Sequence, residues 1–251
     1  MNKITTSEME LINSYSLREL TPEDVYVFSV KLCDNDIDRD YERFTVESLF
    51  ELEKLFVGKT GIIDHNPAVN NQKMRILTCK VEYVKDKVTA VGEPYYCLMA
   101  RVYLLRNDDN QKLINNIEEG LVDEVSIGCS VRRSSCSICH NDIHSPLCNH
   151  RKGKKYVSNG REKLCFVELQ EPTDAYEFAF VAEPKNEAES RHLVDVPIPH
   201  GRLIDADAHI QSLRENQCSE RCRKNHDCIN CGIDMYIRIV ENEPNILDAE
   251  R

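Results

Sequence analysis

A cluster of three cysteines and one histidine constrains the local fold more than any other feature of this sequence. Cys136 and Cys139 are separated by two residues, and Cys148 and His150 follow after about nine more. Two ligands on a tight turn and two more at this distance can close a tetrahedral site, and thiolates with an imidazole suit zinc. Four protein ligands leave no open position for water, so the expected role of the metal is structural.

Alternatives remain for this first cluster. His140 and His144 are two further histidines that could replace one of the four ligands. A set of free thiols without metal is the other interpretation. The expected insert that contains the cluster, here called the knuckle, covers about residues 133–165.

A second cluster near the end of the chain has looser spacing. Its four cysteines also suit zinc, with His226 as an alternative ligand; they are Cys218, Cys222, Cys228 and Cys231.

The first twenty residues lack the basic start and apolar core of a signal peptide, so we expect the protein to stay in a reducing cytoplasm. In that compartment close cysteine pairs indicate metal ligands before disulfides.

Charge and hydropathy exclude two classes of partner. The 251 residues carry a formal net charge of −11, which argues against a general nucleic-acid binder because phosphate contacts need a basic surface. No run reaches the roughly 18 apolar residues of a membrane span. Apolar residues make up 41% of the chain, enough for a core. We therefore expect no nucleic acid and no membrane as partners.

The pattern of apolar residues predicts a β-rich α+β domain with few helices. Thr45 caps one expected helix, which ends before Gly58, and a second covers residues 107–120. A short apolar run ends at His65. Segments rich in β-branched and aromatic residues, or with alternating apolar and polar residues, are expected to form strands. They are residues 25–32, 73–84, 95–105, a stretch around Ser126, 164–169 and 176–181.

The domain organisation follows from these elements. Residues 1–24 are expected as a flexible N-terminal arm, and residues 25–184 as the main domain with the inserted knuckle. Residues 185–200 are polar and then proline-rich, which is typical of a linker. Residues 201–251 form a small Cys-rich C-terminal unit.

Two residues carry the catalytic hypothesis. Ser126 lies in a β-prone run with Gly128 two residues later, and His65 lies at the end of an apolar run before a turn. A serine hydroxyl becomes a useful nucleophile only when a neighbouring base takes its proton, and a carboxylate can orient that base. Three carboxylates are candidates for that role: Glu177 in the later strand, Asp174 just before that strand, and Asp64 beside the histidine.

The order of three motifs resembles a known family. These are Ile-Asp-His-Asn-Pro at residues 63–67, Gly-Leu-Val-Asp-Glu-Val-Ser-Ile-Gly at residues 120–128, and Tyr-Glu-Phe-Ala-Phe-Val-Ala-Glu-Pro at residues 176–184. Together they resemble the prohead, or capsid maturation, serine proteases of tailed bacteriophages, which share a fold with the herpesvirus assemblins. The resemblance covers about residues 25–184.

The resemblance implies an assemblin-like barrel, with Ser126 as nucleophile, His65 as general base and Glu177 as the third member. It implies an endopeptidase that cuts scaffold protein, capsid protein and itself, with possible self-association. The expected location is the phage prohead in the host cytoplasm. The C-terminal unit resembles small uncharacterised phage proteins. The alternative is a catalytically inactive, zinc-stabilised phage assembly protein that binds capsid components.

Overall fold

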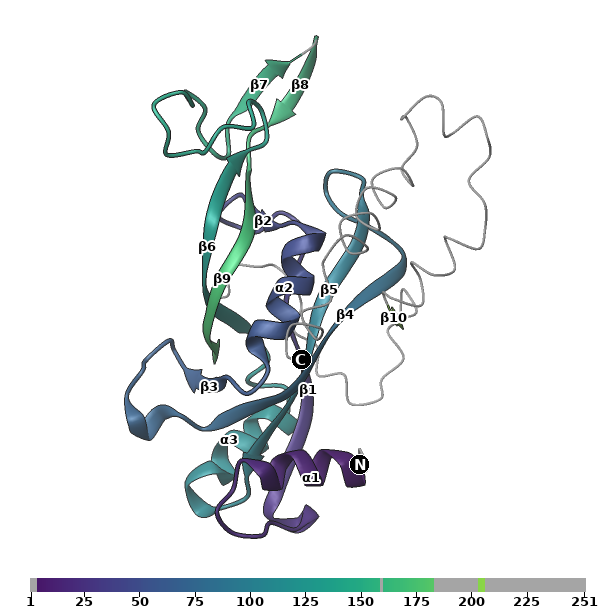
Figure 1. The fold of residues 1–251 in the computed structure, drawn as a ribbon, viewed down its shortest axis with the longest axis vertical. Helices are drawn as coiled ribbons and strands as arrows, with labels where there is room; N and C mark the ends of the chain where they lie inside the picture. The colour runs from purple at the N-terminus through teal and green to yellow at the C-terminus, as the bar shows by residue number, and fades with distance from the viewer. Residues whose placement is uncertain (1–3, 159, 183–202, 206–251) are drawn as a thin grey trace, which may run out of the picture. The chain divides into compact units, whose positions relative to one another are not determined.

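A computed structural model describes residues 4–158, 160–182 and 203–205 of the protein (Figure 1). The chain divides into two units, Met1–Leu203 and Ile204–Arg251, and the described residues belong almost wholly to the first. The predicted linker and the Cys-rich C-terminal unit therefore lie outside the described residues, apart from the short strand β10 (Leu203–Asp205). The second cysteine cluster, with Cys218, Cys222, Cys228 and Cys231, also lies outside them.

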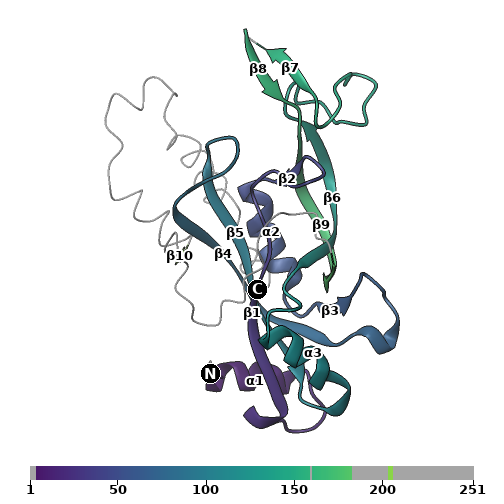
Figure 2. The same ribbon diagram turned by 180° about the vertical axis from the view of Figure 1, so that it is seen from behind.

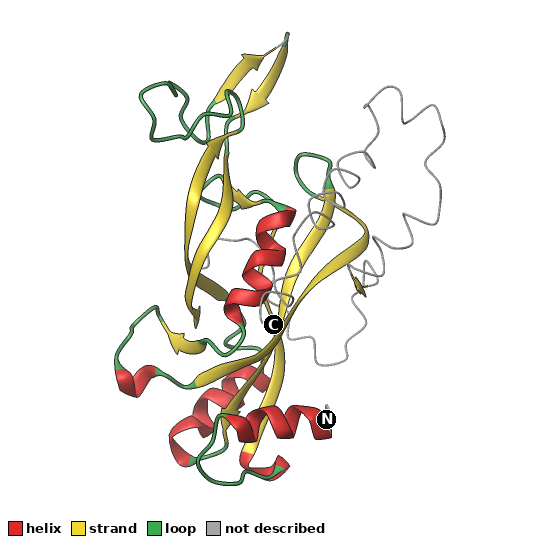
Figure 3. Ribbon diagram, viewed as in Figure 1, coloured by secondary structure: helices red, strands yellow, loops and turns green. Residues whose placement is uncertain are grey.

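A mixed sheet dominates the first unit, as the strands in Figure 3 show. Its main path runs in the order β1 (Val25–Asp34), β5 (Pro94–Leu105), β4 (Met74–Val88), β3 (Thr60–Ile63), β9 (Val167–Phe180) and β2 (Glu42–Phe44). β6 (Val125–Cys136) pairs with β9 beside this path. The predicted strand-rich α+β class is confirmed. The described strands do not close into a barrel, because β1 and β2 do not pair with each other.

β9 joins two segments that the sequence predicts as separate strands, 164–169 and 176–181. It runs unbroken for 14 residues and pairs with β6 along almost all of its length. It is also parallel to β3 and to β2. Between these two contacts β9 pairs only with β6, and Glu171, with a positive φ of 55° and no register partner in β6, marks a bulge in the strand.

The β6–β9 ribbon continues to the pair Cys136 and Val167, so the knuckle lies at the far end of the ribbon (Figure 1). A small hairpin of β7 (Lys155–Ser158) and β8 (Arg161–Leu164) belongs to the same end.

α2 (Val46–Phe56) forms the centre of the core. Thr45 caps it as predicted, and its side chain accepts a hydrogen bond from the backbone N–H of Ser48. Leu49, Leu52 and Phe56 are fully buried along one face. Both Figure 1 and Figure 2 show α2 between the β6–β9 ribbon and the strands β4 and β5, and α2 contacts β9, β4 and β5.

The N-terminal segment differs from the expected flexible arm. Residues 6–14 form α1 (Thr6–Ser14), which begins with a capping box between Thr5 and Glu8. Ile12 is fully buried, and Glu8 accepts a hydrogen bond from the Nε of Arg101 on β5 at 2.7 Å. The sequence shows only one turn of apolar periodicity here, so it predicts at most one helical turn where the structure has the nine residues of α1. The 3₁₀ turn η1 (Pro22–Asp24) then leads into β1.

The remaining helical elements are α3 (Asp108–Glu118), close to its predicted range, and the 3₁₀ turn η2 (Val69–Asn71). α3 buries Ile114 and Ile117, and Gly120 follows it with a positive φ of 69°. The chain then passes directly into β6. This short connection fixes the start of the strand that carries Ser126.

Candidate functional site

His65 lies in a tight turn at the end of β3. Asp64 and His65 both have positive φ, 53° and 51°, and the backbone N–H of Asn66 donates to the carbonyl of Ile63. Two successive positive φ values define a type I′ turn, and each non-glycine residue in that region costs about 1–2 kcal/mol. The side-chain amide of Asn71 holds the turn closed by donating to the carbonyls of Ile63 and Asn66, at 2.7 and 2.9 Å.

Glu177 meets the His65 ring from β9. The Nδ1 of His65 lies 2.8 Å from the Oε1 of Glu177, although 112 residues separate them in the sequence. A carboxylate that accepts the Nδ1–H fixes the ring in the tautomer that leaves Nε2 as an acceptor. The Oε2 of Glu177 is buried and has no hydrogen-bond partner among the described residues. Glu82 and Glu124 also have one such buried oxygen each, but of the three only Glu177 contacts His65.

Gly128 leaves the space that the Glu177 carboxylate occupies. The two residues are direct partners in the β6–β9 register. A Cβ at position 128 would collide with Oε1 of Glu177, the atom that contacts His65. Sterics therefore explain the glycine in the Val-Ser-Ile-Gly motif. The absence of a side chain lets the Glu177 carboxylate approach closely, and the glycine is not needed for an unusual backbone angle.

Ser126 lies on the same sheet face as Glu177. It pairs with Ala179 in the register, and Glu177 is two residues from Ala179. Directly paired residues share a face, and diagonal neighbours have Cα atoms about 7–8 Å apart. The hydroxyl of Ser126 has no hydrogen-bond partner among the residues that the structure describes. Ser126 also borders a cavity of about 160 Å³ shared with Leu32 and Phe44.

The two other candidate carboxylates do not contact His65. The Oδ1 of Asp174 lies 3.2 Å from the Nζ of Lys59, and its side chain is half-exposed. Asp64 precedes His65 in the turn, and its side chain borders the cavity described next. Of the three carboxylates that the sequence leaves open, the structure brings Glu177 to the histidine.

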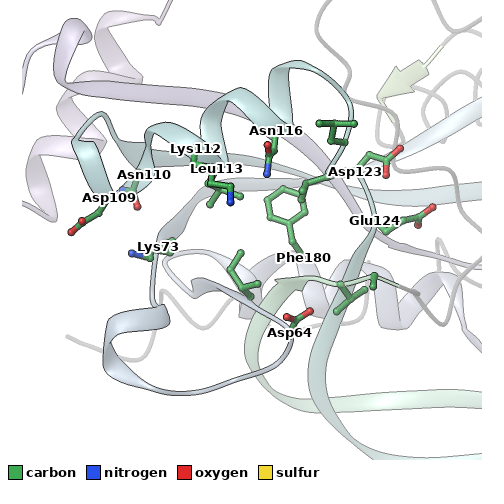
Figure 4. A pocket seen from close by; sticks show the side chains of 15 residues that line it. Asp64, Lys73, Asp109, Asn110, Lys112, Leu113, Asn116, Asp123, Glu124 and Phe180 are labelled. Carbon is green, nitrogen blue, oxygen red and sulfur yellow. The ribbon is translucent and has the colours of Figure 1, made fainter.

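A cavity of about 490 Å³ adjoins this site, as Figure 4 shows. It lies between α3 and the ends of β3 and β9, and Phe180 forms part of its wall. Asp64, beside His65, and Glu124, two residues before Ser126, border it as well. The cavity is therefore next to both elements of the candidate site.

The first cysteine cluster comes together in space. The ligand atoms of Cys136, Cys139, Cys148 and His150 all lie within 4.8 Å of one another, so this group could hold a metal ion. The Sγ atoms of Cys139 and Cys148 are 3.6 Å apart, and the Sγ of Cys148 is 3.9 Å from the Nδ1 of His150. Zinc–sulfur bonds of about 2.3 Å in a tetrahedron give edges of about 3.8 Å, which these separations match.

A fifth donor accompanies the group. The Sγ of Cys165 lies 3.8 Å from that of Cys136, and both residues are fully buried. Cys165 lies 15 residues after His150 and is outside the four-ligand pattern of the sequence, so only the structure brings it to the group. His140 and His144 are exposed and do not belong to the group.

Backbone amides and burial set the thiol acidities around the group. The backbone N–H of Asn141 lowers the pKa of Cys139 to about 6. Burial raises the pKa of Cys165 to about 12. A donor such as the Asn141 N–H stabilises the Cys139 thiolate, the form that binds metal.

Three cysteines in β1, β4 and β5 are small residues of the sheet. Cys33 and Cys97 are almost fully buried, and Cys79 is half-buried. Burial raises the pKa of Cys79 and of Cys97 to about 12. These thiols therefore stay protonated and unreactive at neutral pH.

Comparisons with protein-family models, with curated proteins and with solved structures found no match to this chain. None of the helices in the described ranges is both long and apolar enough to cross a membrane. The geometry of the two sites is thus the basis for the functional conclusions.

Proposed function

We propose that the protein is a serine endopeptidase with Ser126 as nucleophile, His65 as general base and Glu177 as the residue that orients the base. The observation that carries this proposal is the 2.8 Å contact between His65 and Glu177, on the sheet face that also carries Ser126. The strained turn at His65 and the orphaned Oε2 of Glu177 add support.

The proposed reaction is acyl transfer. Nε2 of His65 removes the proton from the hydroxyl of Ser126 as the oxygen attacks the scissile carbonyl, and later returns that proton to the leaving amine. Glu177 accepts the Nδ1–H and stabilises the imidazolium that forms in between. A peptide side chain would occupy the cavity beside Asp64 and Glu124, which has the volume for one large residue.

The order of the three motifs supports a more specific assignment. It resembles that of the phage prohead proteases, so the proposed substrates are scaffold and capsid proteins and the protease itself, inside the prohead in the host cytoplasm. An assemblin-like fold is part of this proposal, although the described strands form an open sheet and no closed barrel. In the knuckle, zinc is the proposed metal, held by Cys136, Cys139, Cys148 and His150 with a structural role.

A second candidate function rests on one observation. No hydrogen bond joins Ser126 to His65 among the described residues, and a nucleophile must come within hydrogen-bond reach of its base to react. A zinc-stabilised assembly protein without activity, which binds capsid components, would need no such contact.

Co-expression with the neighbouring capsid gene separates the two candidates. Mass spectrometry should find trimmed termini on the capsid protein or on the protein itself, and Ser126→Ala should abolish them. Ser130→Ala is the matched control, because Ser130 lies on the same strand and its hydroxyl contacts Thr173 at 2.8 Å. Equal trimming by the Ser126→Ala variant would reject the protease, and no trimming by the unmodified protein would favour the assembly role.

A further inference from the structure

Positive charge is concentrated in the knuckle. The knuckle and the two residues before it, 131–165, contain eight lysines and arginines but two acidic residues, in a chain whose formal net charge is −11. The eight basic side chains are all exposed: Arg132, Arg133, Arg151, Lys152, Lys154, Lys155, Arg161 and Lys163. The chain-wide average therefore conceals a basic region at the far end of the β6–β9 ribbon (Figure 1).

Five of these cations have no acidic partner among the described residues. Lys152, Lys155 and Arg132 form ion pairs, with Glu42, Glu162 and Glu171 respectively. The five others have none: Arg133, Arg151, Lys154, Arg161 and Lys163. Unneutralised, exposed cations on a rigid element are available to a polyanion.

Two of the five share a face with an aromatic ring. In the β7–β8 hairpin Tyr156 pairs with Lys163, and Ser158 pairs with Arg161. Side chains alternate along a strand, so Tyr156, Arg161 and Lys163 lie on the same face of the hairpin. The backbone N–H of Arg151 donates to the Oη of Tyr156 at 3.0 Å, which brings Arg151 to this position as well.

The Tyr156 ring is held by the metal-binding group. It packs edge-on against the ring of His150, with 4.6 Å between the centroids. His150 is one of the four candidate ligands. A ring fixed in this way loses little conformational entropy when a flat partner stacks on it.

We propose that this face of the knuckle binds single-stranded nucleic acid. The Tyr156 ring provides a surface on which a base can stack, and Arg151, Arg161 and Lys163 provide contacts for the flanking phosphates. Single-strand binding without sequence preference combines these two elements, aromatic platforms and a basic track. An acidic polypeptide would use the cations but would gain nothing from the ring. This proposal is independent of the proposed protease activity, because it uses no residue of the His65 site.

The test measures binding of the full-length protein to labelled oligo-dT and oligo-rU of about 16 nucleotides by fluorescence anisotropy, over a series of salt concentrations. Affinity should fall with salt, and Arg161→Gln with Lys163→Gln should reduce the slope of log affinity against log salt by about 1.4. The matched control is Lys54→Gln with Lys85→Gln, which removes two exposed charges from α2 and β4 and should leave the slope unchanged.

Substitution of Tyr156 distinguishes the two classes of polyanion that could bind here, nucleic acid and an acidic protein. Tyr156→Leu should weaken binding roughly 5- to 100-fold without changing the salt slope, whereas Tyr156→Phe should retain binding within about twofold, because the ring remains. No binding at low salt would overturn the proposal. So would displacement of the oligonucleotide by poly-glutamate of equal length together with an unchanged affinity of the Tyr156→Leu variant, a result that indicates an acidic protein partner.

Discussion

The sheet face around His65 and the metal-binding knuckle are assembled from different ranges of the chain. His65 and Glu177 are 112 residues apart in sequence and meet because β3 and β9 are neighbours in the sheet. The four candidate metal ligands fall within residues 136–150 and meet through local turns. The first site depends on the register of the whole sheet, while the second, a group that could hold a metal ion, depends on a short loop. Damage to one should therefore leave the other intact.

Residues 35–42 form the structural connection between the two regions. Gly153 of the knuckle packs closely on the ring of Tyr41, and the backbone N–H of Val167 donates to the carbonyl of Tyr41. Lys152 pairs with Glu42 at 2.6 Å. Asp34, at the end of β1 just before this segment, is buried and accepts a hydrogen bond from Tyr95. The segment supports the base of the knuckle from the side of the sheet.

The largest expected effect is loss of the metal. Cys139→Ser should lower the metal content from one ion per chain to below about a tenth, since structural zinc sites contribute roughly 10 kcal/mol of binding free energy. Hydrogen exchange should become fast in residues 137–166 while β4 and β5 stay protected. Metal analysis and exchange mass spectrometry measure both. Cys79→Ser is the matched control, because Cys79 lies in β4 outside the group; metal-free protein with a protected knuckle would contradict the site.

The substitution Glu177→Gln tests whether Glu177 orients His65 on the sheet face that carries Ser126. The amide can donate to Nδ1 and so favours the wrong tautomer of His65, and processing should fall about 10⁴-fold with unchanged metal content. Glu171→Gln on the same strand is the control, since its exposed carboxylate pairs with Arg132 at 3.6 Å. Full processing by the Glu177→Gln variant would remove Glu177 from the catalytic set.

Gly128→Ala should act on the same contact with a smaller effect. The added methyl group displaces the flexible end of Glu177 from His65, so we expect processing to fall about 100-fold through misplacement of the base. The midpoint temperature of thermal unfolding, measured by circular dichroism, should change by only a few degrees, because no backbone atom obstructs the added methyl group. A large loss of stability with normal processing of the folded fraction would contradict this explanation of the glycine.

The smallest effect concerns pH and the segment that connects the two regions. Burial raises the pKa of Asp38 to about 6, above the value of about 3.9 in an unfolded chain. The folded state then holds the proton more tightly, so stability should fall as pH rises from about 4 to 6 and stay level above that. Because Asp38 is partly exposed, the loss should be about 1 kcal/mol. Denaturant unfolding across this range measures it, and Asp38→Asn should remove this part of the pH dependence.

Much of the fold could be predicted from the sequence because its signals are local. Thr45 caps α2 as expected, α3 ends before Gly120, and the apolar run before His65 forms β3. The predictions were less accurate where long-range pairing overrides local preference. Two predicted strands are the single strand β9, and α1 is held by contacts such as the one between Glu8 and Arg101 rather than by its own periodicity.

The two sites show the same division between what local sequence signals predict and what long-range pairing decides. The spacing of Cys136, Cys139, Cys148 and His150 by itself predicted the group that could hold a metal ion, since ligands close in sequence need only a tight turn to converge. The sequence also indicated His65 as a candidate base and Ser126 as a candidate nucleophile, but it did not decide which of three carboxylates contacts the histidine. Only the tertiary structure decided for Glu177, because the parallel pairing of β3 with β9 and the missing side chain at Gly128 together set which carboxylate reaches the ring.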